Sequence, residues 1–437
     1  MTSAAPSPDV LVIGAGITGT ATALALAEAG ARVEVLERYA PAAMASGWTL
    51  AGVRQSGRDP AELPLARAAV RCWQRLDERL DAETGYRQGG NLRLARDEDE
   101  VTLIRELVAS QGAAGLALEL VDGETLREIA PALSPDIVLA SWCPSDGHAD
   151  PHATVAAYAA AARRLGVRFR SGTAVERLLV QGGRFRAAVT ANGPLVAERC
   201  VLAAGIQTND LLADIAPTLP IRTPVVTVVQ SEPLPPLLGP VIGVANADLA
   251  VRQQLDGRLR MTSGAETRPV ELREQDGRPR VPIAAGSLAG AIARVSAVLP
   301  IAAEASVARL WGGLLDVTPD ALPVLDRVPE VGGLVVAAGF SGHGFGIGPA
   351  VAEGLAALAL DRAPPLSLDA FRFERFVTFD EAASGAVDTA RDARATASAE
   401  REGGVAAADR ERHRPASLGE SDVRAGTDAP FAGSLHG

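Results

Sequence analysis

Three glycines and an acid near the start of the chain are the residues best suited to chemistry. Gly14, Gly16 and Gly19 follow an apolar run over residues 9–13, and Glu37 ends the next apolar run. Gly14 permits a tight turn, Gly16 lets the backbone approach a pyrophosphate, and Gly19 lets a helix press on the strand. The helix N-terminus attracts the anion, and the Glu37 carboxylate accepts hydrogen bonds from ribose hydroxyls. The spacing predicts a dinucleotide site.

Two later segments also have sequences that fit a nucleotide site. Residues 199–205 read as an apolar strand that ends in small residues, where Ala204 and Gly205 stand. Residues 339–349 hold a glycine at every second position from 342 to 348, so backbone N–H groups can approach a flat ligand. Pro349 is expected to open a helix whose positive end faces the same ligand. We therefore expect three remote segments to build one nucleotide site.

Length, composition and charge narrow the class of protein. A chain of 437 residues with 47% hydrophobic residues predicts two domains and a tail. Its net charge of −11 argues against nucleic acid and against an anionic membrane surface. No apolar run reaches membrane-spanning length, and residues 1–8 lack a basic leader, so we expect a cytoplasmic protein without a membrane span.

The cysteine and lysine content of the chain argues against metal binding by cysteine and excludes catalysis by lysine. Cys72, Cys143 and Cys200 stand far apart and in no metal-ligand spacing, so they are expected to be packing residues. The sequence contains no lysine, and all 42 basic residues are arginine, which excludes a Schiff-base lysine.

The chain reads as alternating helices and strands, followed by a polar tail. Helices are expected over 59–80, over 98–130 with a break at 112–115, and over 288–299. Asp150 is expected to cap a helix that begins at Pro151. Strands are expected at 91–94, 167–170, 174–180, 185–190, 195–204 and 333–339. Residues 377–437 are expected to be disordered, because their composition buries too little apolar surface.

These motifs together resemble the family of FAD-dependent amine and amino-acid oxidoreductases that includes D-amino-acid oxidase, glycine oxidase and sarcosine oxidase. The resemblance covers about residues 8–376 and is carried by residues 10–38, 46–55, 146–151, 201–205, 318–320, 339–349 and 371–376. Within the family, residues 52–55 and 342–345 are most similar to the sarcosine oxidase β and D-amino-acid dehydrogenase-like branch.

The resemblance implies an α/β fold, α+β overall, with two domains. A Rossmann-like FAD-binding domain would combine residues 8–88, 145–218 and 312–376. A mostly antiparallel substrate-binding domain would combine residues 89–144 and 219–311.

The resemblance also implies a role for each matching residue. Gly14, Gly16, Gly19, Glu37 and Arg38 would hold the adenosine and pyrophosphate. Ser46 would lie near the phosphate or ribityl chain, Val175 would use its backbone at the adenine, and Ala204 and Gly205 would pass close to the cofactor. The flavin ring would be lined by Gly342, Gly344, Phe345, Gly346 and Ile347. FAD is expected to be non-covalent, because residues 312–315 lack the cysteine that tethers flavin in one-chain sarcosine oxidases.

Three residues are candidates for handling the substrate. Arg54 and Arg252 can each bind a carboxylate through the planar guanidinium fork, although either also reads as a solvated or structural arginine. His343 is expected to orient the substrate or contact the flavin, and bracing of the loop is the alternative. No metal is expected, because the helix that Asp150 caps separates His148 from His152.

The expected reaction is oxidation of the C–N bond of glycine, sarcosine, a proline-like compound or a D-amino acid, by hydride transfer to flavin N5 and hydrolysis of the imine. A dehydrogenase is favoured over an oxidase, because the one-chain enzymes use a lysine above the flavin for oxygen and only Arg260 is a candidate for that place. An oxygen-using oxidase, an FAD-dependent hydroxy-acid dehydrogenase and a flavin subunit of a larger amine dehydrogenase stay open, as does the electron acceptor or partner subunit.

Overall fold

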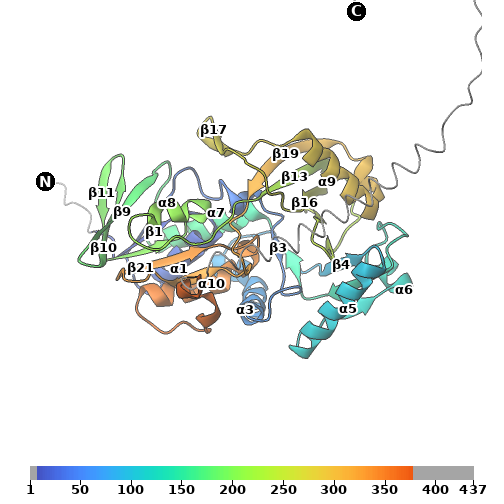
Figure 1. Cartoon of the computed structure of the whole chain (residues 1–437), viewed down its shortest axis with the longest axis horizontal. Helices are drawn as coiled ribbons and strands as arrows, with labels where there is room; N and C mark the ends of the chain where they lie inside the picture. Colours follow the sequence, from blue (N-terminus) through green and yellow to red (C-terminus); the bar gives the residue numbers. More distant parts are fainter. Residues whose placement is uncertain (1–6, 377–437) are drawn as a thin grey trace, which may run out of the picture. The chain divides into compact units, whose positions relative to one another are not determined.

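The computed structural model describes residues 7–376, which belong to one compact unit (Figure 1). The expected disordered tail, residues 377–437, lies outside the described residues. Within the described part of the chain, no helix is both long and apolar enough to cross a bilayer.

The first sheet is the parallel sheet expected for a dinucleotide fold. Its six strands run in the order β20-β21-β12-β1-β2-β8, and only the edge strand β20 is antiparallel to its neighbour. Because the carboxyl ends of parallel strands meet at one edge, the loops after β1, β12 and β21 come together there. The strands are β1 (Val10–Ile13), β2 (Val33–Leu36), β8 (Arg168–Arg170), β12 (Arg199–Leu202), β20 (Val324–Arg327) and β21 (Leu334–Ala338).

Both faces of this sheet are covered, which is why its strands are apolar without alternation. Val10 and Val12 face a core that includes α1 (Ile17–Glu28), α7 (Pro151–Arg164) and α10 (Gly344–Ala359). Leu11 and Ile13 face the opposite core. That core is closed by β9 (Val175–Gln181), β10 (Arg184–Thr190), β11 (Gly193–Val196) and α8 (Thr208–Leu212).

The second large sheet has eight strands in the order β19-β13-β16-β15-β14-β4-β6-β5, antiparallel except where β14 meets β4. Here the side chains alternate: Val229, Val251 and Met261 pack with α9 (Ala285–Val298). The strands are β4 (Asn91–Ala95), β5 (Glu119–Val121), β6 (Leu139–Cys143), β13 (Val225–Pro233), β14 (Val241–Val244), β15 (Leu249–Gln253), β16 (Arg258–Ser263) and β19 (Val307–Leu314). The two sheets draw on the segments expected to form separate domains, but the domain boundaries stay a prediction.

Shorter elements connect these sheets. They are α2 (Ala45–Trp48), β3 (Gly52–Val53), α3 (Leu63–Trp73), α4 (Leu76–Leu80), α5 (Glu98–Ala113), α6 (Gly123–Ile129), β7 (Gly147–His148), β17 (Arg273–Gln275) and β18 (Arg278–Arg280). The short strands β3 and β7 pair with each other, which joins the loop after Ser46 to the segment before α7. The Asp150 cap is confirmed, because its side chain accepts a hydrogen bond from Ala153 N at 2.7 Å.

Four predicted elements were wrong in their bounds. Residues 98–130 form two helices, but the segment between them is longer than the expected break and contains the strand β5, which pairs with β6 at the edge of the second sheet. Residues 195–204 form two strands, because β11 pairs with β10 whereas β12 crosses to β1 and β21 in the first sheet. Residues 59–80 form two helices, and the first begins at Leu63 with a proline in its first turn. Pro349 lies inside α10, which begins five residues earlier at Gly344.

Candidate functional site

A cavity of about 400 Å³ lies at the carboxyl edge of the parallel sheet and extends to the second sheet. The glycine turn after β1, the end of β2 and the loop after β12 line one part of it. The start of α10 lines another part, and Val226, Val228 and Thr262 reach it from the second sheet. The cavity therefore joins the three segments that the sequence predicted to meet.

The turn after β1 is too tightly packed for any residue but glycine. Gly14 has φ +100°, and a Cβ there would lie 2.3 Å from Ala203 O. A Cβ on Gly19 would lie 1.9 Å from Gly14 O, so helix and turn touch directly. At the N-terminus of α1, Ile17 N donates to Ser46 Oγ at 2.9 Å. The other N–H groups of the first turn have no partner within the helix, which favours an anion.

Glu37 lies beside this turn with both carboxylate oxygens oriented by the backbone. Its Oε2 accepts from Ala15 N at 2.7 Å and its Oε1 accepts from Tyr39 N at 2.8 Å. Burial raises the pKa of Glu37 in spite of these hydrogen bonds. Each oxygen keeps a lone pair, so the carboxylate can accept further hydrogen bonds from a diol such as ribose.

The N-terminus of α10 lies at the same cavity, next to α1 (Figure 1). Gly342, Gly344 and Phe345 line the cavity. Gly346 and Gly348 instead allow close packing: a Cβ on Gly346 would lie 2.9 Å from Gly52 O, and one on Gly348 would lie 2.8 Å from Ile17. The positive ends of two helix dipoles therefore reach one cavity.

Asp316 is a buried acid of the cavity that the sequence analysis missed. Its Oδ2 accepts from Gly339 N at 2.9 Å, at the end of β21. Burial raises the pKa of Asp316 to about 6, although the N–H groups of Phe340 and Gly339 oppose the shift. The available signal was its position two residues before the run 318–320, which carries part of the resemblance.

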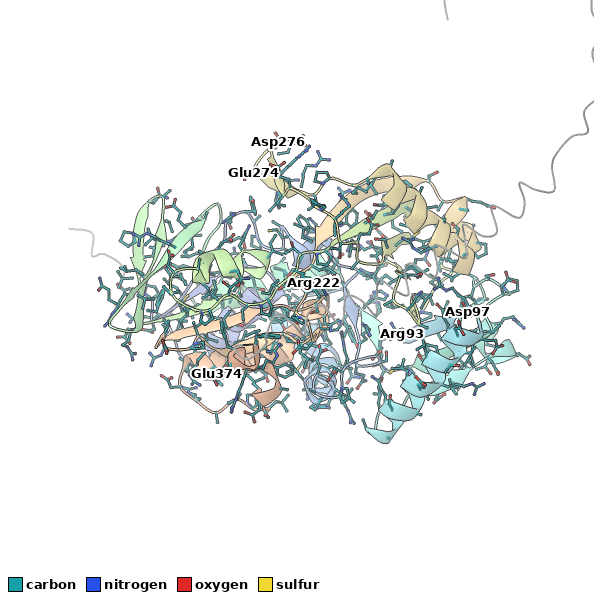
Figure 2. The ribbon with its side chains drawn as sticks, viewed as in Figure 1. Arg93, Asp97, Arg222, Glu274, Asp276 and Glu374 are labelled. Carbon is teal, nitrogen blue, oxygen red and sulfur yellow. The ribbon has the colours of Figure 1, made fainter. Side chains whose placement is uncertain are left out.

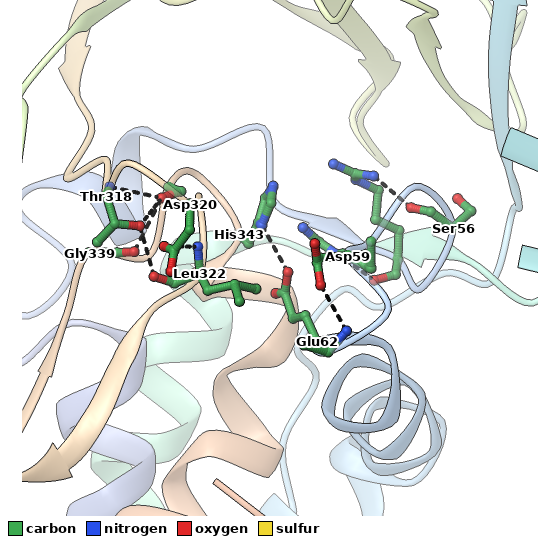
Figure 3. A network of polar contacts seen from close by, with 12 residues as sticks. Ser56, Asp59, Glu62, Thr318, Asp320, Leu322, Gly339 and His343 are labelled. Carbon is green, nitrogen blue, oxygen red and sulfur yellow. Dashed lines mark hydrogen bonds and ion pairs between the residues drawn. The ribbon is translucent and has the colours of Figure 1, made fainter. Parts of the chain in front are cut away.

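Next to Asp316, Thr318 closes the loop before β20. Its Oγ1 donates to Leu322 O at 2.8 Å (Figure 3). The same Oγ1 lies 3.3 Å from Ser341 Oγ. These bonds tie the loop before β20 to the loop before α10.

His343 lies at the N-cap of α10 and contacts Glu62, which the sequence analysis also missed (Figure 3). Burial tends to raise the pKa of Glu62, but Arg58 and His343 outweigh it and hold the pKa at about 2. Burial, and then Arg58, lower the pKa of His343 to about 4. At neutral pH the imidazole is thus neutral and the carboxylate charged, so Nδ1–H donates to Glu62 and Nε2 is left as an acceptor.

The two candidate arginines lie in different settings, and neither lines the cavity. Arg252 is 2% exposed and donates to Leu50 O and, at 3.0 Å, to Ala149 O; its Nη1 lies 3.1 Å from His148 Nδ1. Arg54 donates to Ser56 O at 2.6 Å. Burial, then the like charges of Arg58 and Arg93, lower the pKa of Arg54 well below its usual value.

Most of the predicted cofactor residues come together. Those that line the cavity are Gly14, Gly16, Glu37, Arg38, Ser46, Val175, Ala204, Gly205, Gly342, Gly344 and Phe345. Gly19, Gly346 and Ile347 are not among the lining residues, and neither are the three residues predicted to handle substrate, Arg54, Arg252 and His343. None of the three cysteines lines the cavity, and residues 7–376 hold no cluster of His, Cys, Asp and Glu suited to a metal ion.

The parallel sheet, its glycine turn and the buried acid at the end of β2 define a dinucleotide-binding protein. The residues present fit FAD in particular, because a second helix N-terminus and the glycines at positions 342 and 344 line the same cavity. The family model described as FAD dependent oxidoreductase matches residues 9–358, and the chain belongs to this family. The predicted fold, cofactor and family are thereby confirmed.

Curated relatives are similar over most of this chain. Glycine oxidase from Bacillus licheniformis is 26% identical over 386 residues, which cover 84% of this chain and 97% of that protein. Sarcosine oxidase subunit beta from Arthrobacter sp is 28% identical, with 87% and 95% covered. The 4-methylaminobutanoate oxidase (formaldehyde-forming) of Paenarthrobacter nicotinovorans is 27% identical, and the match spans only 45% of its length.

Among solved structures, L-proline dehydrogenase from P. horikoshii superposes with a TM-score of 0.78 at 26% identity, covering 85% of this chain and 98% of that one.

Proposed function

We propose that this FAD-dependent oxidoreductase oxidises the C–N bond of a small amino acid or secondary amine. The observation that carries the proposal is the convergence of two helix N-termini and the Glu37 carboxylate on one cavity that also reaches the second sheet. The names of the relatives, which act on glycine, sarcosine and proline, support this substrate class. Bound FAD supplies the two-electron oxidation by accepting hydride from the substrate carbon, and water then hydrolyses the imine.

The residues of this chain hold the cofactor and orient it. The first turn of α1 faces the pyrophosphate, and Glu37 binds the ribose hydroxyls. The first turn of α10 would direct its positive end at the flavin, and this end of the helix dipole favours negative charge there. Asp316 orients the loop at Gly339, through the hydrogen bond to its N–H.

Arg54 and His343 would act on the substrate. Arg54 is placed beside the start of α10, since a Cβ on Gly346 would lie 3.6 Å from Arg54 N. Its fork suits a carboxylate. His343, held in one tautomer by Glu62, presents Nε2 as an acceptor for a substrate N–H. Arg252, whose donors are engaged by Leu50 O, His148 and Ala149 O, supports the loop at the cavity.

We favour a dehydrogenase with a separate electron acceptor and a non-covalent FAD. The sequence has no lysine to assist oxygen, and Arg260 is engaged with Trp311 at 4.8 Å and with Gly47 O at 3.3 Å. The non-covalent FAD agrees with the positions of the cysteines, outside the cavity. Acid precipitation should release the FAD into the supernatant, whereas a yellow pellet would show a covalent bond.

Anaerobic titration of the FAD-loaded protein tests the reaction. Glycine, sarcosine, proline and a set of D-amino acids are added in turn while the flavin absorbance is followed. Bleaching by at least one amine supports the proposal. Bleaching by hydroxy acids alone overturns it and supports a hydroxy-acid dehydrogenase. Stopped-flow mixing of the reduced protein with air-saturated buffer then tests whether oxygen is the electron acceptor. Rapid reoxidation of the flavin would identify an oxidase.

A further inference from the structure

We infer that Arg93, on the second sheet, binds the substrate carboxylate together with Arg54, at the end of a corridor that begins at the FAD cavity. This inference rests on the proposed function for the identity of its ligand. Arg93 was not among the candidate residues of the sequence and lies on β4; Figure 2 labels it.

The strand register places the corridor on one face of the second sheet. Thr262 on β16 lies opposite Ala250 on β15, Gly243 on β14 pairs with both Ala250 and Arg93 on β4, and directly paired residues share a face. Thr262 lines the FAD cavity. With about 4.8 Å between neighbouring strands, three steps put about 14 Å between the backbones at the two ends of this row.

The middle of this row is open. Thr262, Ala250, Gly243 and Arg93 are all half-buried. Ala250 has only a methyl group, and a Cβ built on Gly243 would meet no atom closer than 4.0 Å. The alternate positions, by contrast, are filled: Leu92, Leu94, Val251 and Met261 pack into the core beneath. Small side chains therefore line this row between Thr262 and Arg93, and we take the row as the corridor of the inference.

At the end of the path, two guanidinium groups converge. A Cβ on Gly57 would lie 2.9 Å from Nη1 of Arg93 and 3.0 Å from Nη1 of Arg54, so these two nitrogens are no further apart than the sum of those distances. Gly57 has φ +66°, so only glycine fits easily between them. Two like charges this close repel each other unless an anion lies between them.

The neighbouring carboxylates do not neutralise Arg93. Among the acids, Glu62 acts most strongly on Arg58, and Asp146 accepts from Gln55 N, Ser56 N and Ser56 Oγ. Within residues 7–376, no carboxylate pairs with Arg93; burial and the like charge of Arg58 lower its pKa. Arg93 is thus a half-buried cation without a carboxylate partner among the described residues, and its planar guanidinium group can bind a carboxylate.

Carboxylate binding can be measured without turnover. The FAD-loaded protein is titrated with acetate, propionate and benzoate at constant ionic strength, and the dissociation constant is taken from the change in flavin absorbance. We expect saturable binding to the wild type. Arg93→Met should raise the dissociation constant at least about tenfold, the effect of losing one charged hydrogen bond. The dissociation constant of Arg93→Lys should lie between those of wild type and Arg93→Met, because lysine keeps the positive charge but cannot make two parallel hydrogen bonds to a carboxylate.

Arg105→Met is the matched control, since Arg105 is exposed on α5, and its dissociation constants should stay at the wild-type value. Unchanged carboxylate binding in FAD-loaded Arg93→Met, or no saturable binding in the wild type, would overturn the inference. If Arg93→Met does not retain FAD, Arg93→Lys and Arg93→Gln decide by the same measurement.

A second measurement separates this inference from the proposed function. Sarcosine and dimethylamine share the N-methylamine and differ by the carboxylate, so Arg93→Met should raise the KM for sarcosine and leave the weaker reaction of dimethylamine unchanged. If no amine reduces the flavin, the proposed function is wrong. The carboxylate titration still tests whether Arg93 binds a carboxylate, because it does not depend on turnover.

Discussion

Nδ1 of His343, at the start of α10, lies 3.1 Å from Oε2 of Glu62, at the start of α3. Glu62 is completely buried, and Arg58 is the cation that acts on it most strongly. A buried acid thus connects the helix at the flavin with the loop that carries the arginines. Two atoms of this cluster, Arg58 Nη1 and Glu62 Oε1, are buried without a hydrogen-bond partner in the structure, which makes the cluster sensitive to any change of charge.

Glu62→Gln should destabilise the protein by about 3 to 5 kcal/mol, because Arg58 loses its counter-ion while it stays buried. The pKa of Glu62 is lowered from 4.5 to about 2, so the stabilisation is complete above pH 4.5 and is lost as the pH falls towards 2. Urea denaturation at several pH values measures this loss. Glu98→Gln, at an exposed position of α5, serves as the control. Equal stability of Glu62→Gln and wild type at neutral pH would contradict the prediction.

Asp316→Asn should have the opposite pH dependence. Burial raises the folded-state pKa of Asp316 from 3.8 to about 6, so the folded wild type holds its proton more tightly than the unfolded chain does. Wild-type stability therefore falls as the pH rises from 3.8 to 6. The variant does not lose this stability, because an asparagine side chain does not ionise. The variant should gain on the order of 3 kcal/mol relative to wild type by about pH 7, and no more above it. Urea denaturation at several pH values measures the difference in the free energy of unfolding between Asp316→Asn and wild type. Asp99→Asn, at an exposed position of α5, should show no such difference. If the difference for Asp316→Asn did not depend on pH, the buried carboxylate could not be its cause.

Gly19→Ala and Gly112→Ala should act in opposite directions, although both glycines lie in helices. A Cβ at position 19 would lie 1.9 Å from the backbone oxygen of Gly14, whereas one at position 112 would meet nothing within 4 Å. We expect Gly19→Ala to abolish FAD binding or folding. Gly112→Ala should stabilise α5 by about 0.5 to 1 kcal/mol. Thermal denaturation and flavin content measure both, and an FAD-loaded Gly19→Ala protein of normal stability would refute the packing argument.

Glu37→Gln should weaken FAD binding about tenfold to a hundredfold, since charged hydrogen bonds to the ribose become neutral ones. Quenching of flavin fluorescence on addition of FAD to the apoprotein gives the dissociation constant. Glu176→Gln, at an exposed position of β9, should bind FAD as the wild type does. Undiminished FAD affinity of Glu37→Gln would remove Glu37 from the ribose site.

The FAD end of the cavity could be predicted because its signals are local in sequence. The turn of Gly14, the close contact of Gly19 and the acid at position 37 all belong to one strand-helix-strand unit. Each residue there is recognisable from its own conformational or chemical requirement. The prediction failed at the start of α10, since an isolated glycine-rich segment disfavours helix. In the structure, packing of Gly346 and Gly348 against Gly52 and Ile17 stabilises that turn.

The substrate end could not be predicted, because it depends on pairing between distant segments. Arg93 approaches Arg54 only when β4 inserts beside β14, a contact between strands about 150 residues apart along the chain. Glu62 reads as an ordinary helix start until α10 places His343 against it. Arg252 resembled a substrate ligand until three acceptors were found around its guanidinium.

The direct pairing of Thr262, Ala250, Gly243 and Arg93 across four rigid strands has a consequence for how substrate choice can change. Adding a methyl group at Gly243, or exchanging the methyl group of Ala250 or the hydroxyl group of Thr262, would narrow or redirect the row that leads to the two arginines. Single substitutions on this sheet are therefore expected to change the preference for short or long acids without any change in the loops that line the FAD cavity.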